Sequence, residues 1–292
     1  MKKLCLLLFV VFLFSALSHG VSVAGTVCNY DGTGAIIATT GVGAQCSPTP
    51  QGYDVTIYQL RLCKADPATG TTPDFSTCSV LINGGAQSVH LAAGTSTELA
   101  NVTLPAQGTY GYAVLVASNS IGITLTQTYT AAMVGSAGGT GTTCWTVAGL
   151  VKQQVPTPNL VACGAVAAAA TTVDKIDNFG NGGGNDPSAG GVFNGRSTTE
   201  AVTGGTIYAK LATTNLTAAT GANFPDGITR ILAVEAFTTP VVIGAQSTSL
   251  NIGFNVSNSV SPWITGGAGG TAAGGTIHQF GAGPFSITIS AN

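Results

Sequence analysis

Residues 110–129 read YGYAVLVASNSIGITLTQTY, with apolar side chains at alternate positions over two separate runs. The first run extends from Tyr110 to Val116 and the second from Ile121 to Tyr129, where Gly and Thr fill most of the positions between. A period of two is typical of β-strands that bury one face. The polar triplet Ser118-Asn119-Ser120 predicts a turn between the runs. We therefore expect an antiparallel hairpin with one apolar and one Thr-rich face.

Residues Tyr53–Cys63 form a denser apolar segment, which predicts a strand inside a sheet that is covered on both faces. Under strict alternation, Val55 and Ile57 face one side while Tyr58, Leu60 and Leu62 face the other. Further strand patterns occur at Ile228–Phe237, Leu250–Val256 and Phe285–Ser290. No long segment has the 3.6-residue period of a helix. The chain is therefore predicted to be all-β, with two consecutive antiparallel β-sandwich-like domains, the first braced by disulfides.

The segment Leu104–Tyr112, LPAQGTYGY, precedes the first of these runs. It resembles the turn that leads into a late strand of immunoglobulin-like sandwiches, where a tyrosine hydroxyl returns to the backbone. The resemblance covers nine residues of the 292. An ordinary turn before a tyrosine-containing strand is the alternative interpretation.

The N-terminal segment has the layout of a secretory signal. Lys2 and Lys3 precede an apolar run at 4–17, which is too short to span a bilayer comfortably. Small residues at Ser22 and Ala24 favour cleavage after Ala24. We therefore expect a secreted protein, extracellular or at the cell surface, with no integral membrane span in the mature chain. An uncleaved N-terminal anchor is the alternative.

The cysteines divide the chain. Beyond the signal there are six, all in the first part: Cys28, Cys46, Cys63, Cys78, Cys144 and Cys163. An even set in an exported chain predicts disulfides. Sequential pairing is expected, because each such pair brackets a loop rich in Gly, Pro or Asp. We expect a signal peptide at 1–24, a disulfide-containing domain at 25–172, a Gly/Asn/Asp-rich linker at 173–191 and a second β domain at 192–292. One larger unit with a long internal loop is the alternative.

The charge content is low. Charged residues make up 7% of the chain, and without Lys2 and Lys3 it carries 7 basic and 11 acidic residues, a formal charge of −4. Nucleic acid is therefore not an expected partner, because its binding requires a basic surface. A surface of Thr, Ser, Asn and Gly repels copies of itself only weakly, and it suits neutral glycans.

Hard oxygen ligands cluster in the predicted linker, at Asp174, Asp177, Asn178, Asn185 and Asp186. The run Gly182–Asp186 partly resembles a calcium-binding nonapeptide repeat, in which glycines permit tight turns and carboxylates face the ion. The resemblance implies a calcium-stiffened joint. A flexible polar linker with incidental acidic residues is the favoured interpretation. No other cofactor is expected.

Catalytic motifs are missing from the sequence, so an enzyme is not expected. There is no G-x-S-x-G elbow, no H-E-x-x-H pair and no phosphate-binding loop. The three glutamates, Glu98, Glu200 and Glu235, are far apart in sequence, although a glycosidase needs two carboxylates together in space. Trp263 follows Pro262 and precedes a Gly-rich loop, so it is a candidate ligand contact or a loop anchor.

Two functions fit these features. The first is a self-associating structural subunit of an extracellular fibre, pilus-like appendage, matrix or coat. Its terminal strand, with Phe285, Ile287 and Ile289, would pair between subunits. The second is a monomeric adhesin or glycan-binding module that uses its loops.

Overall fold

The computed structural model describes residues 27–37, 46–69, 72–93, 99, 102–152, 159–176, 179, 197–219, 227–265 and 274–292. The predicted signal peptide at 1–24 lies outside these residues. Among them, every named element is a β-strand, which confirms the all-β prediction. The described part contains no helix that is long and apolar enough to cross a membrane.

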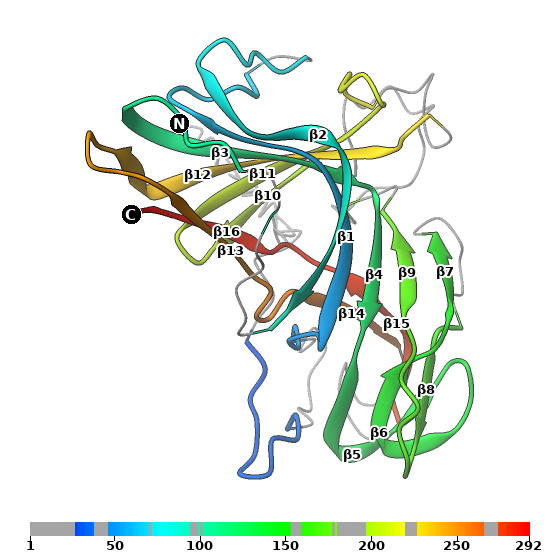
Figure 1. Ribbon diagram of the computed structural model, residues 1–292. Helices are drawn as coiled ribbons and strands as arrows, with labels where there is room; N and C mark the ends of the chain where they lie inside the picture. The colour runs from blue at the N-terminus through cyan, green and yellow to red at the C-terminus, as the bar shows by residue number, and fades with distance from the viewer. Residues whose placement is uncertain are drawn as a thin grey trace, which may run out of the picture.

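The strands form three sheets (Figure 1). The nine-stranded sheet contains β1 (Gly52–Cys63), β2 (Cys78–Ala92), β3 (Gly108–Ser118), β4 (Ser120–Thr124), β7 (Gly149–Lys152), β9 (Thr172–Lys175), β10 (Ser197–Val202), β11 (Gly205–Ala212) and β12 (Arg230–Ile243). The five-stranded sheet contains β5 (Thr126–Gly135), β6 (Thr140–Thr146), β8 (Val161–Gly164), β14 (Val260–Thr265) and β15 (Thr276–Ala282). The two-stranded sheet contains β13 (Leu250–Asn255) and β16 (Ser286–Ala291).

The nine-stranded sheet bends. Its hydrogen-bonded order is β10-β11-β12-β3-β1-β4-β9-β7, and β2 also pairs with β1. Figure 1 shows β3, β10, β11 and β12 across the top of the molecule and β4, β7 and β9 down one side. The β13–β16 pair lies beneath the top part. A hydrophobic core with members from all three sheets fills the space between them.

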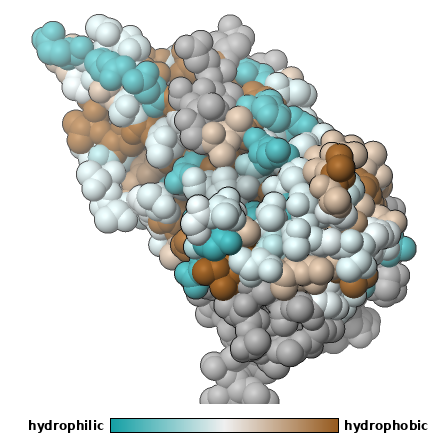
Figure 2. Space-filling view, turned by 90° about the horizontal axis from the view of Figure 1, so that it is seen from below, coloured by the Kyte–Doolittle hydropathy of each residue, from teal (hydrophilic) through white to brown (hydrophobic). Residues whose placement is uncertain are grey.

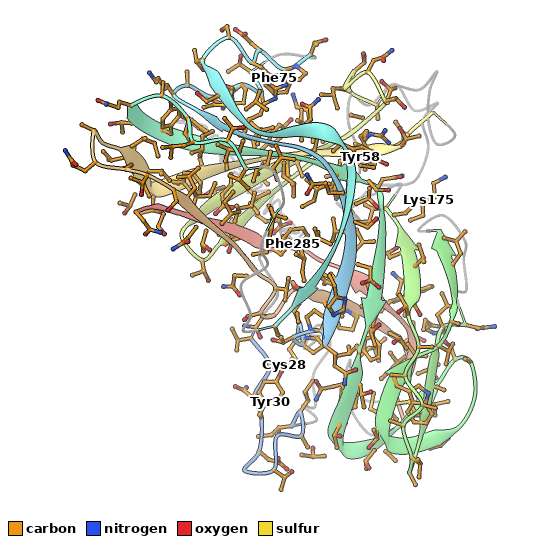
Figure 3. The ribbon with its side chains drawn as sticks, in the orientation of Figure 1. Cys28, Tyr30, Tyr58, Phe75, Lys175 and Phe285 are labelled. Atoms are coloured by element: carbon orange, nitrogen blue, oxygen red, sulfur yellow. A yellow bond between two sulfur atoms is a disulfide. The ribbon has the colours of Figure 1, made fainter. Side chains whose placement is uncertain are left out.

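Strand β1 lies inside the sheet, as its apolar sequence predicts, and pairs with β2, β3 and β4. The predicted division of its side chains between two faces is right for Tyr58 and wrong for Leu60 and Leu62. The register shifts between Ile57 and Gln59, so a β-bulge at Tyr58 changes the alternation. Leu60 and Leu62 therefore belong to the same core as Val55 and Ile57. Tyr58 belongs to a smaller cluster that also contains Phe75, which Figure 3 shows at the top of the molecule.

The predicted hairpin at 110–129 is also wrong. β3 and β4 follow one another along the same partner: Cys63 to Ile57 of β1 pair with β3, and Asp54 to Gly52 pair with β4. Between the two strands, the Asn119 side chain is 3% exposed. Its Nδ2 donates to the carbonyls of Ile176, at 3.1 Å, and Ile228, at 3.3 Å. The polar triplet is therefore a buried junction that fixes two other segments, and the chain does not reverse there.

Strands from both sides of the predicted linker share the large sheet. β12 pairs with β3 from Arg230 opposite Ser118 to Ile243 opposite Gly108, with one register shift. The first residues of the predicted linker belong to β9, which pairs with β4 and β7. Residues 180–191 lie outside the described part. The sheet therefore combines strands from before and after that segment.

The six cysteines form three disulfides in sequence order, as predicted. Cys63–Cys78 joins β1 to β2, and Cys144–Cys163 joins β6 to β8. Both of these pairs are direct register partners. Cys28–Cys46 ties the first described segment to the residues that precede β1. Three disulfides are typical of proteins that fold in an oxidising compartment.

The turn before β3 has the hydrogen bond that its sequence suggests. The Tyr110 hydroxyl donates to the carbonyl of Ala106 at 2.8 Å and lies 3.2 Å from the Ser79 hydroxyl. The tyrosine side chain is 1% exposed. It therefore fixes the entry of the chain into β3.

Candidate functional site

A cavity of about 240 Å³ lies between the large sheet and the strands that cover it. Its floor on the large sheet includes Leu115, Glu200, Ile207, Ala209, Ala233 and Glu235. The opposite wall includes Ser261, Trp263, Gln279, Phe285 and Ile287. The site therefore uses β3, β10, β11 and β12 on one side and β14, β15 and β16 on the other.

Small side chains in adjacent strands explain why there is space on the floor. Ala209 of β11 is the register partner of Ala233 of β12, which in turn pairs with Leu115 of β3. Register partners point to the same face of a sheet. Two neighbouring alanines therefore leave a hollow that larger residues would fill.

Glu235 is the central polar group of the cavity. Its side chain is 1% exposed, and Oε2 accepts a hydrogen bond of 2.7 Å from the backbone N–H of Ile287. Within the described structure, the buried Oε1 atom has no hydrogen-bond partner. Burial raises the pKa of Glu235 to about 7, against the opposing effect of the Ile287 hydrogen bond.

Glu200 lies on the same face, two strands away. It pairs with Ile207 of β11, which pairs with Glu235 of β12, so the three residues form one row across the sheet. Glu200 is 4% exposed. Among the described residues that line the cavity, none is Lys, Arg or His. Two carboxyl groups without a lining cation are costly to bury, which marks this row as a functional candidate.

Trp263, the predicted ligand contact, lines this cavity and is 36% exposed. Its ring packs against His278 with centroids 4.7 Å apart. His278 Nε2 lies 2.6 Å from the Thr265 hydroxyl. Ser261 and Trp263 are the exposed members of the described lining, whereas the glutamates are buried. The cavity thus has an open end near Trp263 and a closed, acidic end.

The candidate calcium ligands have different positions. Asp174 is fully buried in β9, where Oδ2 accepts a hydrogen bond of 2.8 Å from the backbone N–H of Ala282. Asp177, Asn178, Asn185 and Asp186 lie outside the described residues. The part of the chain that the structure describes contains no group of three or more His, Cys, Asp or Glu side chains that could hold a metal ion.

The predicted pairing strand lies against its own chain. β16 pairs with β13 over six register positions, including Ile287 opposite Phe254 and Ile289 opposite Ile252. Phe285 packs against Tyr53, at 6.1 Å between ring centroids, and against Phe254, at 6.0 Å. Figure 3 shows Phe285 beneath the large sheet. This segment forms part of the cavity wall.

Glu200 and Glu235 were not identified as a site from sequence. A usable signal was present, because Glu235 interrupts the apolar run ILAVEAF at 231–237. A charge inside such a run indicates a special environment. Sequence could not show that β10 and β12 flank the same strand and so bring Glu200 into that row.

The site as a whole is an apolar chamber with acidic groups at its closed end and an indole ring at its mouth. Such a combination of apolar walls and few polar groups is typical of small-molecule sites. No protein family model, no characterised protein and no solved structure was found to match this chain.

Proposed function

We propose that this protein is an extracytoplasmic binding protein that holds a small, largely apolar ligand in the cavity between the large sheet and β14–β16. The main support for this proposal is the Glu235 carboxyl group, which is buried at the end of an apolar chamber. Its Oε1 atom has no hydrogen-bond partner in the described structure. A buried polar atom without a partner destabilises the fold, and a ligand that satisfies it removes that cost.

The volume sets the size of the ligand. Cavities of about 150 Å³ lined by aliphatic side chains admit benzene. By proportion, the 240 Å³ chamber holds roughly ten non-hydrogen atoms. The lining favours an apolar body, because Leu115, Ile207 and Ile287 line the chamber together with the two alanines. A glycan would need a different surface, since sugar hydroxyls would find few partners here.

Binding of nine-atom ligands tests this function. Octan-1-ol and octylamine are titrated into the full mature chain and followed by isothermal titration calorimetry. We expect at least one of them to bind, and Ala233→Leu to abolish binding by filling the floor. Thr206→Leu is the matched control, because Thr206 is exposed and lies next to Ile207 on β11, pointing to the other face. Absence of binding by both ligands, or unchanged binding in Ala233→Leu, would contradict the proposal.

We further propose self-association into a surface structure as a second candidate function. The supporting observation is β2, a fifteen-residue strand whose one strand partner in the described structure is β1 and which contains no Lys, Arg, Asp, Glu or Pro. Sheet edges of monomers usually carry such residues to prevent pairing. Figure 2 shows a face of mostly intermediate hydropathy, in keeping with the low charge content.

Light scattering and electron microscopy of the purified chain test this second function. We expect oligomers or polymers that Ser88→Lys weakens, because Ser88 is exposed on β2 and a lysine there opposes edge pairing. Ser290→Lys, exposed on β16, asks whether the terminal strand is used instead. Deletion of residues 284–292 should abolish assembly if that strand pairs between subunits. A monomer at all concentrations contradicts self-association.

A further inference from the structure

Building on the proposed binding function, we infer that the ligand is a lipophilic amine whose protonated nitrogen binds the carboxylate of Glu235, while its apolar body lies over Ala209 and Ala233. The inference rests on which charges line the chamber, which oxygen remains to accept a hydrogen bond, and where the polar group lies.

The charges of the lining select a cation. Glu200 and Glu235 are its titratable groups, and the described lining has no basic side chain. An anionic head, such as that of a fatty acid, would meet two carboxyl groups in a low-dielectric space and would be repelled. A protonated amine instead compensates a buried carboxylate and forms charge-assisted hydrogen bonds.

The hydrogen bonds of Glu235 define the contact. The Ile287 N–H binds Oε2 and holds the carboxyl group in one orientation. Oε1 is then the atom that accepts a hydrogen bond from a ligand, since it is buried without a partner in the described residues. An ammonium group has three N–H donors on a compact head, so one can reach Oε1 while others remain for Glu200 or Gln279, which also line the chamber.

The position of the glutamates orients the ligand. Both are buried, whereas Ser261 and Trp263 are the exposed lining residues. The amine therefore enters first, and the alkyl body extends past the alanine floor towards Trp263. Glu235 and the Ala209–Ala233 pair lie on neighbouring inward-facing positions of β12 and β11, which places the head and the start of the body side by side.

Three ligands of matched length separate this inference from simple apolar binding. Octylamine, octan-1-ol and octanoate are titrated at pH 8, where both Glu235 and a protonated amine carry charge. We expect octylamine to bind at least about tenfold more tightly than octan-1-ol, because a hydrogen bond to a charged group is stronger than one between neutral groups. Octanoate should bind most weakly of the three.

Glu235→Gln is the matched variant, because the amide keeps the size and can still accept the Ile287 hydrogen bond. It should remove the preference for the amine, so that the ratio of octylamine affinity to octan-1-ol affinity falls from at least about ten to about one. The Tm at pH 5 verifies that the variant is folded. If octan-1-ol or octanoate binds as tightly as octylamine, and Ala233→Leu removes that binding, the amine inference fails and the binding function stands. If none of the three binds, the binding function itself fails.

Discussion

The carboxyl group of Glu235 and the backbone N–H of Ile287 are joined by a hydrogen bond of 2.7 Å, which connects β12 of the large sheet to the C-terminal strand β16. The same carboxyl group lines the cavity. The Glu235 carboxyl group therefore both holds the terminal strand and forms part of the cavity wall. Sites that bind ligands often reduce the stability of the unliganded fold in this way.

Glu235→Gln should change how stability depends on pH. Burial raises the folded-state pKa of Glu235 to about 7. The Glu235 carboxyl group therefore binds a proton more tightly in the folded protein than in the unfolded chain. This tighter binding stabilises the folded state. The stabilisation is fully present below the pKa of Glu235 in the unfolded chain and is lost as the pH rises through about 7, its pKa in the folded protein. Relative to Glu235→Gln, the free energy of unfolding of the wild type should therefore fall by about 3 kcal/mol between pH 4 and pH 8.

Urea denaturation across this pH range measures the difference between the two proteins. Glu200 of β10 is the second carboxyl group that lines the cavity. The variant Glu200→Gln is therefore measured in the same way, as the control for any contribution of that group to the pH dependence. Asp174, whose carboxylate binds the neighbouring Ala282 N–H, is unchanged in every variant and cancels in the comparison. Parallel pH profiles for the wild type and Glu235→Gln would show that Glu235 does not titrate in this way.

The sequence predicts the strands better than it predicts their connections. Alternating side chains identify β3, β13 and β16, because burial of one face imposes a period of two, and a dense apolar run identifies β1. Alternation does not predict the bulge at Tyr58 or the junction at Asn119, since each depends on contacts with distant segments. The acidic row of the cavity is hidden for the same reason: the order of strands in the sheet places Glu200 near Glu235.

Asn119→Ala should destabilise the protein strongly. The substitution leaves the buried carbonyls of Ile176 and Ile228 without the amide that they bind. Unpaired buried acceptors cost roughly 1–3 kcal/mol each, so we expect a loss of about 2–6 kcal/mol in the free energy of unfolding. Chemical denaturation provides the measurement, with exposed Asn251→Ala as the control. A loss no larger than that of the control would mean that Asn119 does not anchor these segments.

Removal of the Cys63–Cys78 disulfide should also lower stability. The bond closes a loop with a sequence separation of 15 and joins register partners in β1 and β2. Restricting a loop of this size in the unfolded chain is worth about 3 kcal/mol. We expect the double variant Cys63→Ala/Cys78→Ala to lose a comparable amount, measured by urea denaturation. Peptide mapping without reduction verifies that the other two disulfides remain. Equal stability of the variant and the wild type would contradict this expectation.

Tyr110→Phe tests the turn that leads into β3. The variant keeps the buried ring and removes only the hydroxyl, which donates to the Ala106 carbonyl and lies near the Ser79 hydroxyl. Loss of a buried hydrogen bond between neutral groups costs about 1 kcal/mol, and here the cost should be at the upper end because two partners lose their contact. Tyr112→Phe is the matched control, since Tyr112 is half-buried in the same strand and packs in the smaller cluster on the other face. The difference in free energy of unfolding between the two variants isolates the turn. If both variants lose the same amount, the hydroxyl of Tyr110 has no special role, and packing of its ring alone positions β3.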